Sequence, residues 1–431
     1  MARPQQPTSS PTDVPTAEVA PRLRFPEFRN RKAWPAVNGD KLFDLIDRRP
    51  AAPGLPVLAI TQEHGAIPRD QIDYHVSVTD TSLASYKEVR PNDFIISLRS
   101  FQGGIEYSRH RGICSPAYLI LNRKGQGLDD FYRHLFKSDR FIQQLTRNIE
   151  GLRDGKMISY KQFSEQLLPD PLPAEQQKIA DCLTSLDQTI SAQARKVEAL
   201  KAHKKGLMQH LFPQEGHTLP RLRFPEFRDG PQWKECPLGP MTEKVGSGIT
   251  PLGGDKTYTT SGRPFIRSQN VGWGELLLDD VAHIDEETHK SFDATEIAES
   301  DVLLNITGAS IGRSAVADSR IVGGNVNQHV CIIRIRQAEL NPILLNQFLL
   351  SDRGQQQVDN VQAGGNRQGL NFAQVRSFTI PVPPTDKEQQ RVAECLASIS
   401  ARIANEAIKL SCLIGFKKGL MQQLFPSPEE E

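Results

Sequence analysis

Several features that would place a protein outside the cytoplasm or tie it to a metal are missing from this sequence. The six cysteines stand at positions 114, 182, 236, 331, 395 and 412 without a C-x-x-C pair, so no zinc motif is indicated. No apolar run approaches the roughly 18 residues of a membrane helix, and the N-terminal segment has no apolar signal-peptide region. We therefore expect a reduced, cytoplasmic protein that makes no contact with a membrane.

An excess of charge of either sign is also missing. The 431 residues carry a formal net charge of +1, and 38% are hydrophobic and 24% charged, which is ordinary for a globular protein. The whole chain is therefore not an obvious binder of polyanions, although local basic faces are compatible with this balance. Its length predicts two or three domains. Residues 1–20, rich in Pro, Ser and Thr, are expected to form a disordered leader.

The spacing of familiar catalytic and cofactor motifs is missing too. GSGITPLGGDK at residues 246–256 has Gly-Gly-Asp-Lys where a phosphate loop needs Gly-Lys-Ser/Thr. Glu175 and Lys178 are one residue too far apart for a nuclease Glu-x-Lys, and the histidines form no cluster with metal-ligand spacing. We therefore expect no catalytic site, no metal and no cofactor in this chain.

What the sequence does contain is a repeat. PRLRFPEFR occupies residues 21–29 and again residues 220–228, and a tryptophan follows each copy at the same separation. We interpret this phrase as an extended packing strip that seats a globule. In the first copy Phe25 and Phe28 would point inward and the charges outward.

A longer repeat follows each phrase. Residues 175–213 and 388–426 align without a gap, from EQQ(K/R) at the start to KKGLMQ(H/Q)LFP at the end. Apolar residues recur at alternating steps of four and three, a heptad seam that predicts one long helix per copy. Thr385 and Glu388 predict a capping box, and Pro173 falls at the first helical position, where proline is tolerated.

Both seams are interrupted at the same two places. Gln193 and Glu406 occupy the first place, and Lys204 and Lys417 occupy the second. Polar seam positions lower stability but fix register and partner choice. A glycine, Gly206 in the first copy, lies inside each helix near its end. Either another backbone approaches there or the helix end is loose, and both interpretations stay open.

The order of the segments (phrase, globule, helix, then the same again) predicts how the parts connect. Each helix of about 38 residues would be roughly 57 Å long. Because only QEGHTL separates the first helix from the second phrase, the second globule would begin at the far end of that helix. If the seams bury each other, the helices are antiparallel and the globules lie at opposite ends. A pseudo-two-fold axis would then relate the halves.

The two globules, at about residues 35–168 and 234–381, share a pattern of strands followed by helices. DFIISLRSFQGGIE from Asp93 and DVLLNITGASIGRS from Asp301 each indicate an apolar strand and a small-residue turn. SPAYLIL and NQHVCIIRI indicate further strands, and SDRFIQQ and SDRGQQQ indicate helices. The predicted fold class is α+β: two mixed α/β globules joined by two long antiparallel coiled-coil helices, as a pseudo-two-fold tandem repeat.

Polar and basic loops in both globules are candidates for nucleic-acid contact. Basic residues outnumber acidic ones over residues 87–161, where SLRSFQGGIEYSRHRG lies at a turn from which side chains can project. In the second globule the candidate loops are GSGITPLGGDK, IRSQN, TGASIGR, GGNVNQH and AGGNRQG, which would have to converge on one edge. Residues 275–301 are strongly acidic and are expected to face away from a nucleic acid.

These motifs resemble a known family, the specificity subunits of type I restriction-modification systems. The resemblance covers nearly everything after residue 20. It is carried by the two PxP…EQQ(K/R)(I/V)A helix starts, the two KKGLMQ(H/Q)LFP helix ends, and DVLLNITGASIGR…NVNQHV in the second globule. The first globule departs from the second in SLRSFQGGIEYS and lacks the Asn-Val-Asn-Gln-His run. The family implies such a difference, because each target recognition domain reads a different half-site.

The resemblance implies a DNA-recognition subunit without catalysis of its own. Each globule would be a target recognition domain that reads one half of an asymmetric bipartite site in double-stranded DNA. The chain would bind two methyltransferase subunits, which modify adenine, and motor-nuclease subunits for restriction. S-adenosylmethionine, ATP and magnesium would belong to those partners. The implied leader, first recognition domain, first helix, second recognition domain, second helix and tail are residues 1–20, 21–168, 169–213, 214–381, 382–426 and 427–431.

The residues expected to contact DNA are polar and basic members of the loops. In the first globule they are Arg99, Ser100, Gln102, Tyr107, Arg109, Arg111 and Lys156. In the second they are Thr250, Lys256, Arg267, Gln269, Asn270, Thr307, Ser310, Arg313, Asn325, Asn327, Gln328, Asn366 and Arg367. The recognised sequence and its gap do not follow from these residues, because base preference also depends on loop geometry and DNA shape.

Other interpretations stay open at this point. The chain could be a coiled-coil scaffold whose globules bind proteins, and binding to duplex DNA distinguishes this case. It could be an enzyme with a divergent site, which methylation of DNA by the chain alone would reveal. A system of this family could also methylate without any nuclease partner.

Overall fold

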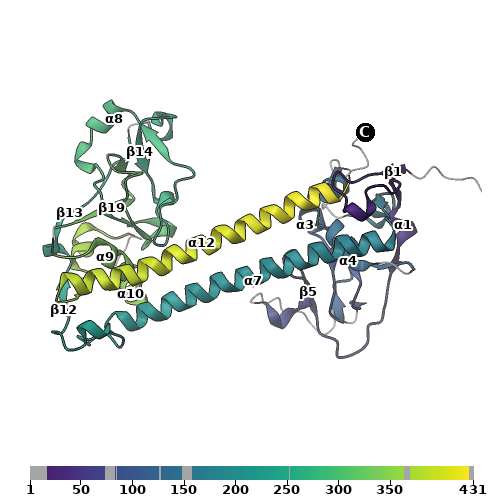
Figure 1. Cartoon of the computed structure of the whole chain (residues 1–431), viewed down its shortest axis with the longest axis horizontal. Coiled ribbons are helices and arrows are strands. Elements are labelled where there is room, and N and C mark those ends of the chain that lie inside the picture. Colours follow the sequence, from purple (N-terminus) through teal and green to yellow (C-terminus); the bar gives the residue numbers. More distant parts are fainter. Residues whose placement is uncertain are drawn as a thin grey trace, which may run out of the picture. The chain divides into compact units, whose positions relative to one another are not determined.

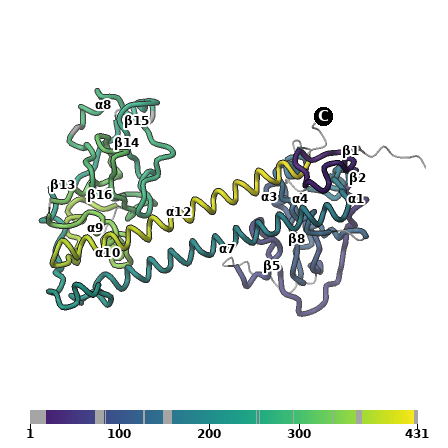
Figure 2. The backbone as a smooth tube through the Cα atoms, viewed as in Figure 1, coloured from purple at the N-terminus to yellow at the C-terminus, as the bar shows by residue number. Residues whose placement is uncertain are grey.

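The computed structural model describes residues 17–72, 83, 85–125, 128–147, 158–251, 253–336, 338–363 and 369–426. The chain divides into two compact units. Unit 1 comprises Met1–Ala192 and Leu410–Glu431, and unit 2 comprises Gln193–Lys409. Figure 1 labels the elements of both units and Figure 2 traces their backbones. Each unit has its own sheets and its own hydrophobic core.

Unit 1 is built around a four-stranded antiparallel sheet with the order β3-β10-β7-β8, accompanied by the sheets β1-β2-β11, β4-β5 and β6-β9. Its strands are β1 Ala17–Val19, β2 Trp34–Asn38, β3 Phe43–Ile46, β4 Leu58–Thr61, β5 Gly65–Pro68, β6 Lys87–Val89, β7 Phe94–Ile96, β8 Glu106–Tyr107, β9 Gly112–Cys114, β10 Leu119–Arg123 and β11 Leu167–Pro169. Its shorter helices are α1 Gly39–Leu42, α3 Ser100–Gly103, α4 Asp129–Leu135, α5 Asp139–Thr146 and α6 Tyr160–Ser164.

Unit 2 is built around the antiparallel sheet β13-β19-β16-β17, with a second sheet β15-β14-β18 and the pair β12-β20. Its strands are β12 Lys234–Pro237, β13 Thr242–Ser247, β14 Arg263–Ile266, β15 Ala282–Ile284, β16 Val302–Asn305, β17 Ser314–Val316, β18 Asn325–Val326, β19 Val330–Ile335 and β20 Thr379–Val382. Its shorter helices are α8 Glu286–Lys290, α9 Pro342–Leu349, α10 Asp352–Ala363 and α11 Phe372–Ser377, and a 3-10 helix, η9, spans Gly308–Ser310.

The main sheets of the two units repeat one topology. In both, the second apolar strand (β7 or β16) pairs antiparallel with the long central strand (β10 or β19) on one side and a short strand on the other. A short helix, α3 or η9, follows directly after β7 or β16. The SDR helices are α5 and α10, and Ser138 caps α5 by accepting the Phe141 N–H. The predicted α+β fold is therefore confirmed, with the same arrangement of strands and helices in both halves.

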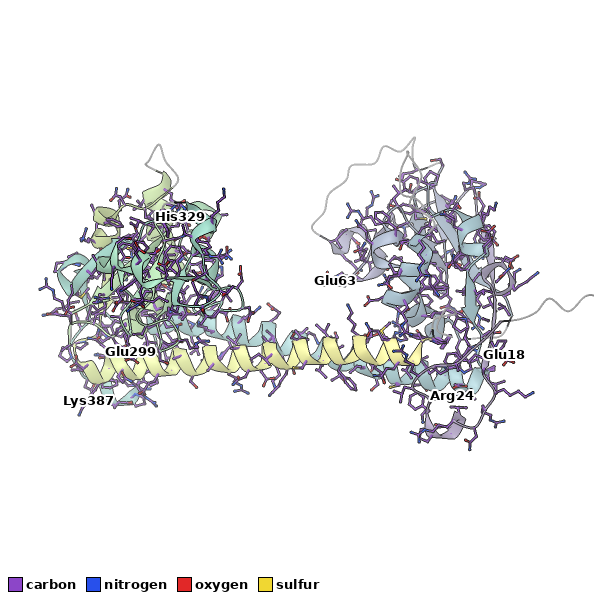
Figure 3. All side chains as sticks on the ribbon, turned by 90° about the horizontal axis from the view of Figure 1, so that it is seen from above. Glu18, Arg24, Glu63, Glu299, His329 and Lys387 are labelled. Carbon is purple, nitrogen blue, oxygen red and sulfur yellow. The ribbon has the colours of Figure 1, made fainter. Side chains whose placement is uncertain are left out.

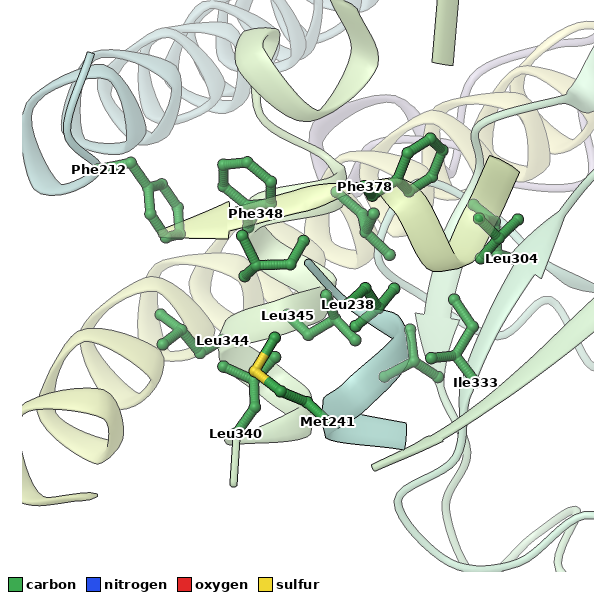
Figure 4. Close-up of a cluster of buried hydrophobic side chains, with 14 of the residues drawn as sticks. Phe212, Leu238, Met241, Leu304, Ile333, Leu340, Leu344, Leu345, Phe348 and Phe378 are labelled. Atoms are coloured by element: carbon green, nitrogen blue, oxygen red, sulfur yellow. The ribbon is translucent and has the colours of Figure 1, made fainter. Parts of the chain in front are cut away.

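The two cores differ in their side chains although the sheets agree. Unit 1 stacks aromatic rings, and Phe43 lies 5.3–5.8 Å, centroid to centroid, from the rings of Phe94, Tyr132, Phe136 and Phe163. Unit 2 fills the same layer mainly with aliphatic residues, as Figure 4 shows around Leu344, Leu345 and Ile333. Both solutions bury comparable apolar layers between sheet and helix, which is what the shared topology requires.

The two long helices are α7, Pro173–Leu211, and α12, Asp386–Leu424, each of 39 residues. In unit 1 the start of α7 shares a core with the end of α12, through Ile179, Leu183, Met421 and Leu424. In unit 2 the end of α7 shares a core with the start of α12, through Met208, Leu211, Val392 and Leu396. Within each unit the helices therefore pack antiparallel, as the seams predict.

The repeated phrase joins the start of one long helix to the end of the other. In unit 1, Arg24 donates from Nε and Nη2 to the two carboxylate oxygens of Glu175 at 2.6 and 2.8 Å, and the Trp34 indole N–H donates to the same carboxylate at 3.0 Å. The Leu23 N–H donates to the carbonyl of Gln423, at the end of α12, at 3.0 Å. We call this set of five residues the first clasp.

The second clasp repeats the first in unit 2. Arg223 donates to both oxygens of Glu388 at 2.7 and 2.8 Å, and Trp233 donates at 2.9 Å. The Leu222 N–H donates to the carbonyl of His210, near the end of α7, at 2.9 Å. Two unlike globules are therefore attached to the helices by the same set of bonds.

The clasps correct the interpretation of the phrase as a strip with all charges outward. Glu175 and Glu388 are each 1% exposed, and a buried carboxylate needs a cation and hydrogen bonds to remain charged. Arg24 and Arg223 therefore point inward. The Glu388 N–H still donates to Thr385 Oγ1 at 3.3 Å. Its carboxylate binds Arg223 and Trp233 instead of returning to Thr385, so half of the predicted capping box forms.

The prediction of a disordered leader over residues 1–20 is contradicted at residues 17–19. Residues 1–16 lie outside the described part of the chain, but Ala17–Val19 form β1, which pairs antiparallel with β2. Val19 pairs with Trp34 and is buried in the core of unit 1. Residues 17–19 therefore extend the sheet that carries the first clasp tryptophan.

Polar residues at the interrupted seam positions form hydrogen bonds and ion pairs between α7 and α12. In unit 2, Gln193 Nε2 donates to the Glu406 carboxylate at 2.7 Å, and Lys196 pairs with the same carboxylate at 2.9 Å. The hydrogen bond from Gln193 and the pairing with Lys196 lower the pKa of Glu406 to about 2. In unit 1, Lys417 pairs with Asp187 at 2.5 Å. Gln193, Glu406 and Lys417 are thus matched across the helix pair, which favours one register, whereas Lys204 has no such partner in the described part of unit 2.

Candidate nucleic-acid interface

Several of the predicted loops of unit 2 converge on one edge, as the sequence interpretation required. Thr307 Oγ1 lies 2.6 Å from His329 Nδ1, and Gln328 Nε2 lies 3.0 Å from His329 Nε2. The Thr250 hydroxyl hydrogen-bonds to the Gln328 side chain. We call Thr250, Thr307, Gln328 and His329 the polar edge of unit 2. Figure 3 shows His329 on the side of this unit away from Lys387.

The backbone explains why these loops meet. The buried strand β16 ends at Asn305, and Gly308 turns the chain with a φ of 73°, a conformation that favours glycine. The Ile306 N–H donates to the His329 carbonyl at 3.0 Å, and Thr307 forms a bridge with Gly369. Loops from three places in the sequence are therefore held side by side by backbone bonds, and their side chains project from the edge.

His329 was not among the predicted contact residues. It ends the Asn-Val-Asn-Gln-His run, whose other polar residues were selected, so its position in that run was the available signal. Its ring bonds to both Thr307 and Gln328 and so organises the polar edge. Hydroxyl, amide and imidazole groups can each donate to phosphate oxygens or to base edges.

Arg313 borders this loop and carries an unsatisfied donor. Its Nε is buried without a hydrogen-bond partner among the described residues, while the residue as a whole is partly exposed. Ser310 is also partly exposed and Lys256 is exposed. A partly exposed arginine beside exposed loops is suited to an acceptor that comes from outside the chain.

Three of the predicted asparagines have internal roles instead. Asn270 is buried and donates to the carbonyls of Leu277 and Asp280, at 2.9 Å each. Asn325 is 0% exposed and bonds to His289 Nδ1 at 2.7 Å and to Thr295 Oγ1 at 3.0 Å.

Asn327, also buried, accepts the His329 N–H at 3.0 Å. The interpretation of these three asparagines as DNA contacts is therefore corrected. Asparagine side chains in loops can hydrogen-bond to nearby backbone groups instead of to a ligand.

Arg267 and Gln269 are tied to the acidic stretch. Arg267 Nη2 pairs with the Asp280 carboxylate at 3.2 Å, and Gln269 Nε2 donates to it at 2.8 Å. Asp280 lies within residues 275–301, which we expected to face away from a nucleic acid. Asp280 thus already occupies Arg267 Nη2 and Gln269 Nε2.

The predicted residues of unit 1 divide in the same way. Arg99, Gln102 and Arg109 are exposed around α3 and β8. Ser100 is buried, where its hydroxyl accepts the Ser97 N–H at 2.9 Å, so its interpretation as a DNA contact is corrected. Tyr107, partly exposed, donates to Asn92 Oδ1 at 2.7 Å.

The side-chain environment also decides the charge state of this region. Burial, with the nearby charge of Asp129, raises the pKa of Tyr107 to about 12, so its hydroxyl remains a donor. Arg111 pairs with Glu88 at 3.0 Å. Hydrogen bonds from Arg90 and Arg111 lower the pKa of Glu88, which therefore stays ionised. Arg111 thus has a partner, whereas no ion pair of Arg99 or Arg109 occurs among the described residues.

A hairpin beside α3 was missed at the sequence level. The tip of β4–β5 packs against the start of α3, where Gln62 Nε2 donates to the Arg99 carbonyl at 3.4 Å. Lys137 donates to the carbonyls of Gln62 and Gly103, at 3.3 and 2.9 Å. The hairpin therefore extends the exposed surface around Arg99. The turn sequence Thr-Gln-Glu-His-Gly was its only local signal.

Three predicted contacts, Lys156, Asn366 and Arg367, lie outside the described residues. Within the described part of the chain, no group of three or more His, Cys, Asp or Glu side chains is arranged to hold a metal ion. No helix there is both long and apolar enough to cross a membrane.

Comparison with known proteins identifies the family. Residues 232–412 match the family model described as the type I restriction modification DNA specificity domain. The chain is 21% identical over 340 residues to the type I restriction enzyme MjaVIII specificity subunit of Methanocaldococcus jannaschii, covering 78% of this chain and 79% of that protein. The chain belongs to the specificity subunits of type I restriction-modification systems. It is the DNA specificity subunit, the non-catalytic targeting component of such a system.

Further relatives agree with this family. The specificity subunit is 20% identical over 385 residues to the putative type I restriction enzyme MjaX specificity subunit of the same organism, covering 86% of each chain. Its fold is similar to the crystal structure of the S subunit from M. genitalium, with a TM-score of 0.58, 15% identity and coverage of 95% of this chain and 99% of that one.

A chain from a structure of the complex assembly and conformational transition of the type I R-M system is similar as well. Its TM-score is 0.55 and its identity 18%, with coverage of 92% and 98%. The specificity subunit therefore shares its fold with the solved S subunit and with a chain of that assembly.

Proposed function

We propose that this specificity subunit reads two unlike half-sites in double-stranded DNA, unit 1 at one and unit 2 at the other. The observation that carries the proposal is the pair of matching clasps. The same Arg–Glu–Trp bonds seat two units whose exposed loops differ in chemistry, α3 with the β4–β5 hairpin in one and the polar edge in the other. Two different surfaces on one scaffold suit an asymmetric bipartite sequence.

The two surfaces offer the groups that DNA recognition needs. Arg99 and Arg109 in unit 1 and Arg313 in unit 2 supply cationic donors for phosphates or for guanine. Gln102 in unit 1 and Gln328 in unit 2 supply amides, whose paired donor and acceptor fit adenine. Thr250, Lys256, Thr307, Ser310 and His329 complete the contact set that we propose for unit 2.

The partners follow from the same family role. We infer that two methyltransferase subunits bind this chain and modify adenine, and that motor-nuclease subunits join for restriction. S-adenosylmethionine, ATP and magnesium would bind to those partners. In each unit the packed parts of α7 and α12 are held by a clasp. They offer one surface per unit, and the two related surfaces suit the two methyltransferase copies. We expect the complex to act in the cytoplasm, where the chromosome is.

The decisive experiment recovers the site and then tests it. Methylome sequencing of the host with and without the gene should return one bipartite motif that carries methyladenine only when the gene is present. The purified chain with its methyltransferase subunits should then shift a duplex with this motif at a salt concentration where random duplexes stay free. Equal affinity for random DNA would contradict the proposal and favour a protein-binding scaffold.

A variant series tests the contact set. Arg99→Ala and Arg313→Ala should each weaken binding to the recovered motif by about tenfold or more, since a specific arginine contact contributes about 1–3 kcal/mol. Lys290→Ala, in the acidic stretch, is the matched control and should change the affinity little. Equal affinities for the three variants, measured by titration at fixed salt, would remove these arginines from the interface.

A further inference from the structure

The repeat contains one place where the two halves do not match. Lys204 in α7 and Lys417 in α12 occupy equivalent seam positions, 213 residues apart. Lys417 is neutralised by Asp187 at 2.5 Å. The residue equivalent to Asp187 is Ser400, which has no charge. Lys204 therefore keeps the cationic position of the seam while its internal carboxylate is missing.

Two lysines next to Lys204 in α7 already have partners. Lys201 pairs with Glu198 at 2.9 Å, and Lys205 pairs with Asp352 at 3.2 Å. For Lys204, no carboxylate lies within ion-pair distance in the described part of unit 2. Glu275 acts on it only from farther away, and burial lowers the pKa of Lys204. A half-buried ammonium group without a partner is an unfavourable arrangement that a ligand carboxylate would relieve.

Lys204 lies in the wall of a cavity of about 1160 Å³ within unit 2. Helices α7 and α12 form two sides of it, and apolar walls are supplied by Met208, Trp273, Leu350 and Ile403. Trp273 is 54% exposed, although tryptophan is usually well covered. We call this cavity the Lys204 pocket. It is large enough for several side chains, and it combines an exposed aromatic ring with Lys204 and Arg221, neither of which forms an ion pair among the described residues. Glu215 and Glu275 also line it.

We propose that the Lys204 pocket is a docking site for an acidic segment of the methyltransferase subunit. A carboxylate of that segment pairs with Lys204, and apolar side chains beside it cover Trp273. Charge complementarity selects this occupant, because the lysines and arginines of the lining outnumber its acidic residues and Lys204 lies without an ion pair next to apolar walls. Aromatic anchors of this kind are enriched in protein interfaces. The inference rests on the proposed function for the identity of the partner.

The inference has a consequence for assembly. In unit 1 the equivalent lysine is already paired with Asp187, so the two methyltransferase copies meet chemically different seats. Only the copy at unit 2 depends on the pocket. Removing the charge of Lys204 should therefore release one methyltransferase copy and leave the other bound.

Two opposite substitutions test this. Lys204→Met keeps the length of the side chain and removes its charge. Ser400→Asp restores the internal carboxylate that unit 1 has at Asp187 and should occupy Lys204 from within. We expect both variants to bind the methyltransferase at unit 2 about tenfold more weakly or worse, as loss of a desolvated charge pair does. Ser400→Asp should also raise the melting temperature of the free chain.

The measurement is native mass spectrometry of the full chain titrated with its methyltransferase subunit, with melting temperatures recorded for every variant. Lys201→Met, in the same wall but already paired on its own helix, is the matched control and should keep two copies. The expected result is two copies for the wild type and the control, and one copy for Lys204→Met and Ser400→Asp at the same concentration.

Three results would overturn the inference. Two copies on every variant would remove the pocket from assembly while leaving the proposed function intact. No assembly by the wild-type chain would overturn both the partner and the site. If Lys204→Met assembles normally but loses affinity for random duplex DNA, the pocket holds a phosphate rather than a protein carboxylate.

Discussion

Two buried glutamates, Glu175 and Glu388, set a strict electrostatic requirement at the scale of single residues. Each receives three hydrogen bonds from an arginine and a tryptophan of the repeated phrase. Those bonds raise the pKa of Arg24 and of Arg223, so both guanidinium groups remain charged. The phrase occurs twice because each copy supplies the arginine that neutralises the buried glutamate at the start of one long helix.

Removing one arginine should therefore be costly. Arg223→Met leaves the Glu388 carboxylate buried without its cation, and we expect the free energy of unfolding to fall by about 3 kcal/mol. Arg228→Met, at the exposed end of the same phrase, is the control and should lie within about 0.5 kcal/mol of the wild type. Urea denaturation of the purified chain measures both. Equal stability of the two variants would show that the clasp is not needed.

A buried histidine makes the stability of unit 1 sensitive to acid. Burial, with the nearby charges of Arg133 and Lys417, lowers the pKa of His134 to about 2 from 6.5. Below pH 6.5 the unfolded chain binds a proton that the folded chain refuses. His134 therefore costs stability as the pH falls from 6.5 towards 2, by about 1.4 kcal/mol per pH unit.

His134→Gln should remove this part of the acid sensitivity. Gln347 occupies the equivalent position in unit 2, so the amide fits this place in the fold. We expect the variant to lose less stability than the wild type between pH 7 and pH 5, in urea denaturation at each pH. Parallel pH profiles for the two proteins would mean that the ring of His134 is protonated in the folded chain.

Residue type alone predicted which side chains are exposed better than it predicted which are buried. Arg99 and Gln328 are exposed as expected, because long polar side chains at turns rarely find enough internal partners. Asn270 and Asn325 were chosen by the same reasoning but bond to backbone and side chains of their own unit. The difference lies in partners far along the chain, which no local pattern reveals.

At the scale of elements, α7 and α12 were predictable because their signal is local. A heptad of apolar spacing spans about two helical turns, so a helix of 39 residues repeats this pattern several times. The hairpin β4–β5 gave almost no signal, because each of its strands has only four residues. Its position beside α3 depends on tertiary contacts of Lys137 and Gln62, which the sequence does not display.

The structure answers part of the question of why a glycine lies near the end of each long helix. A Cβ added at Gly206 or Gly419 would meet no atom of this chain within 4 Å. Close approach of another backbone of the same chain therefore does not explain them. The interpretation that a partner approaches there remains a prediction.

Alanine at these positions separates the two interpretations. Gly206→Ala and Gly419→Ala should each stabilise the free chain by about 1 kcal/mol, because alanine favours a helix more than glycine does. Gly354→Ala is the contrasting control, since its Cβ would meet the Phe348 carbonyl oxygen at 2.2 Å and should destabilise the chain. Melting curves measure all three. If a partner helix packs at Gly206, the alanine variant will also assemble more weakly.

At the scale of the whole molecule, the two units should act independently on DNA. Each has its own core and its own exposed loops, so a change in one surface leaves the other folded. We expect Gln102→Ala in unit 1 to relax base preference in one half of the motif, and Gln328→Ala in unit 2 to relax it in the other half. Selection from randomised duplexes by the assembled complex measures both preferences. Changes spread over both halves by either variant would contradict this division.

Unit 1 is assembled from two stretches of chain, and this has a consequence for biosynthesis. Met421, Leu424 and Phe425 belong to its core, yet they follow every residue of unit 2. A ribosome therefore finishes unit 2 before it makes the segment that completes unit 1. During translation the aromatic core of unit 1 therefore stays partly uncovered until the end of α12 has been made. A premature stop codon near the end of the gene would leave that apolar surface exposed to chaperones and proteases.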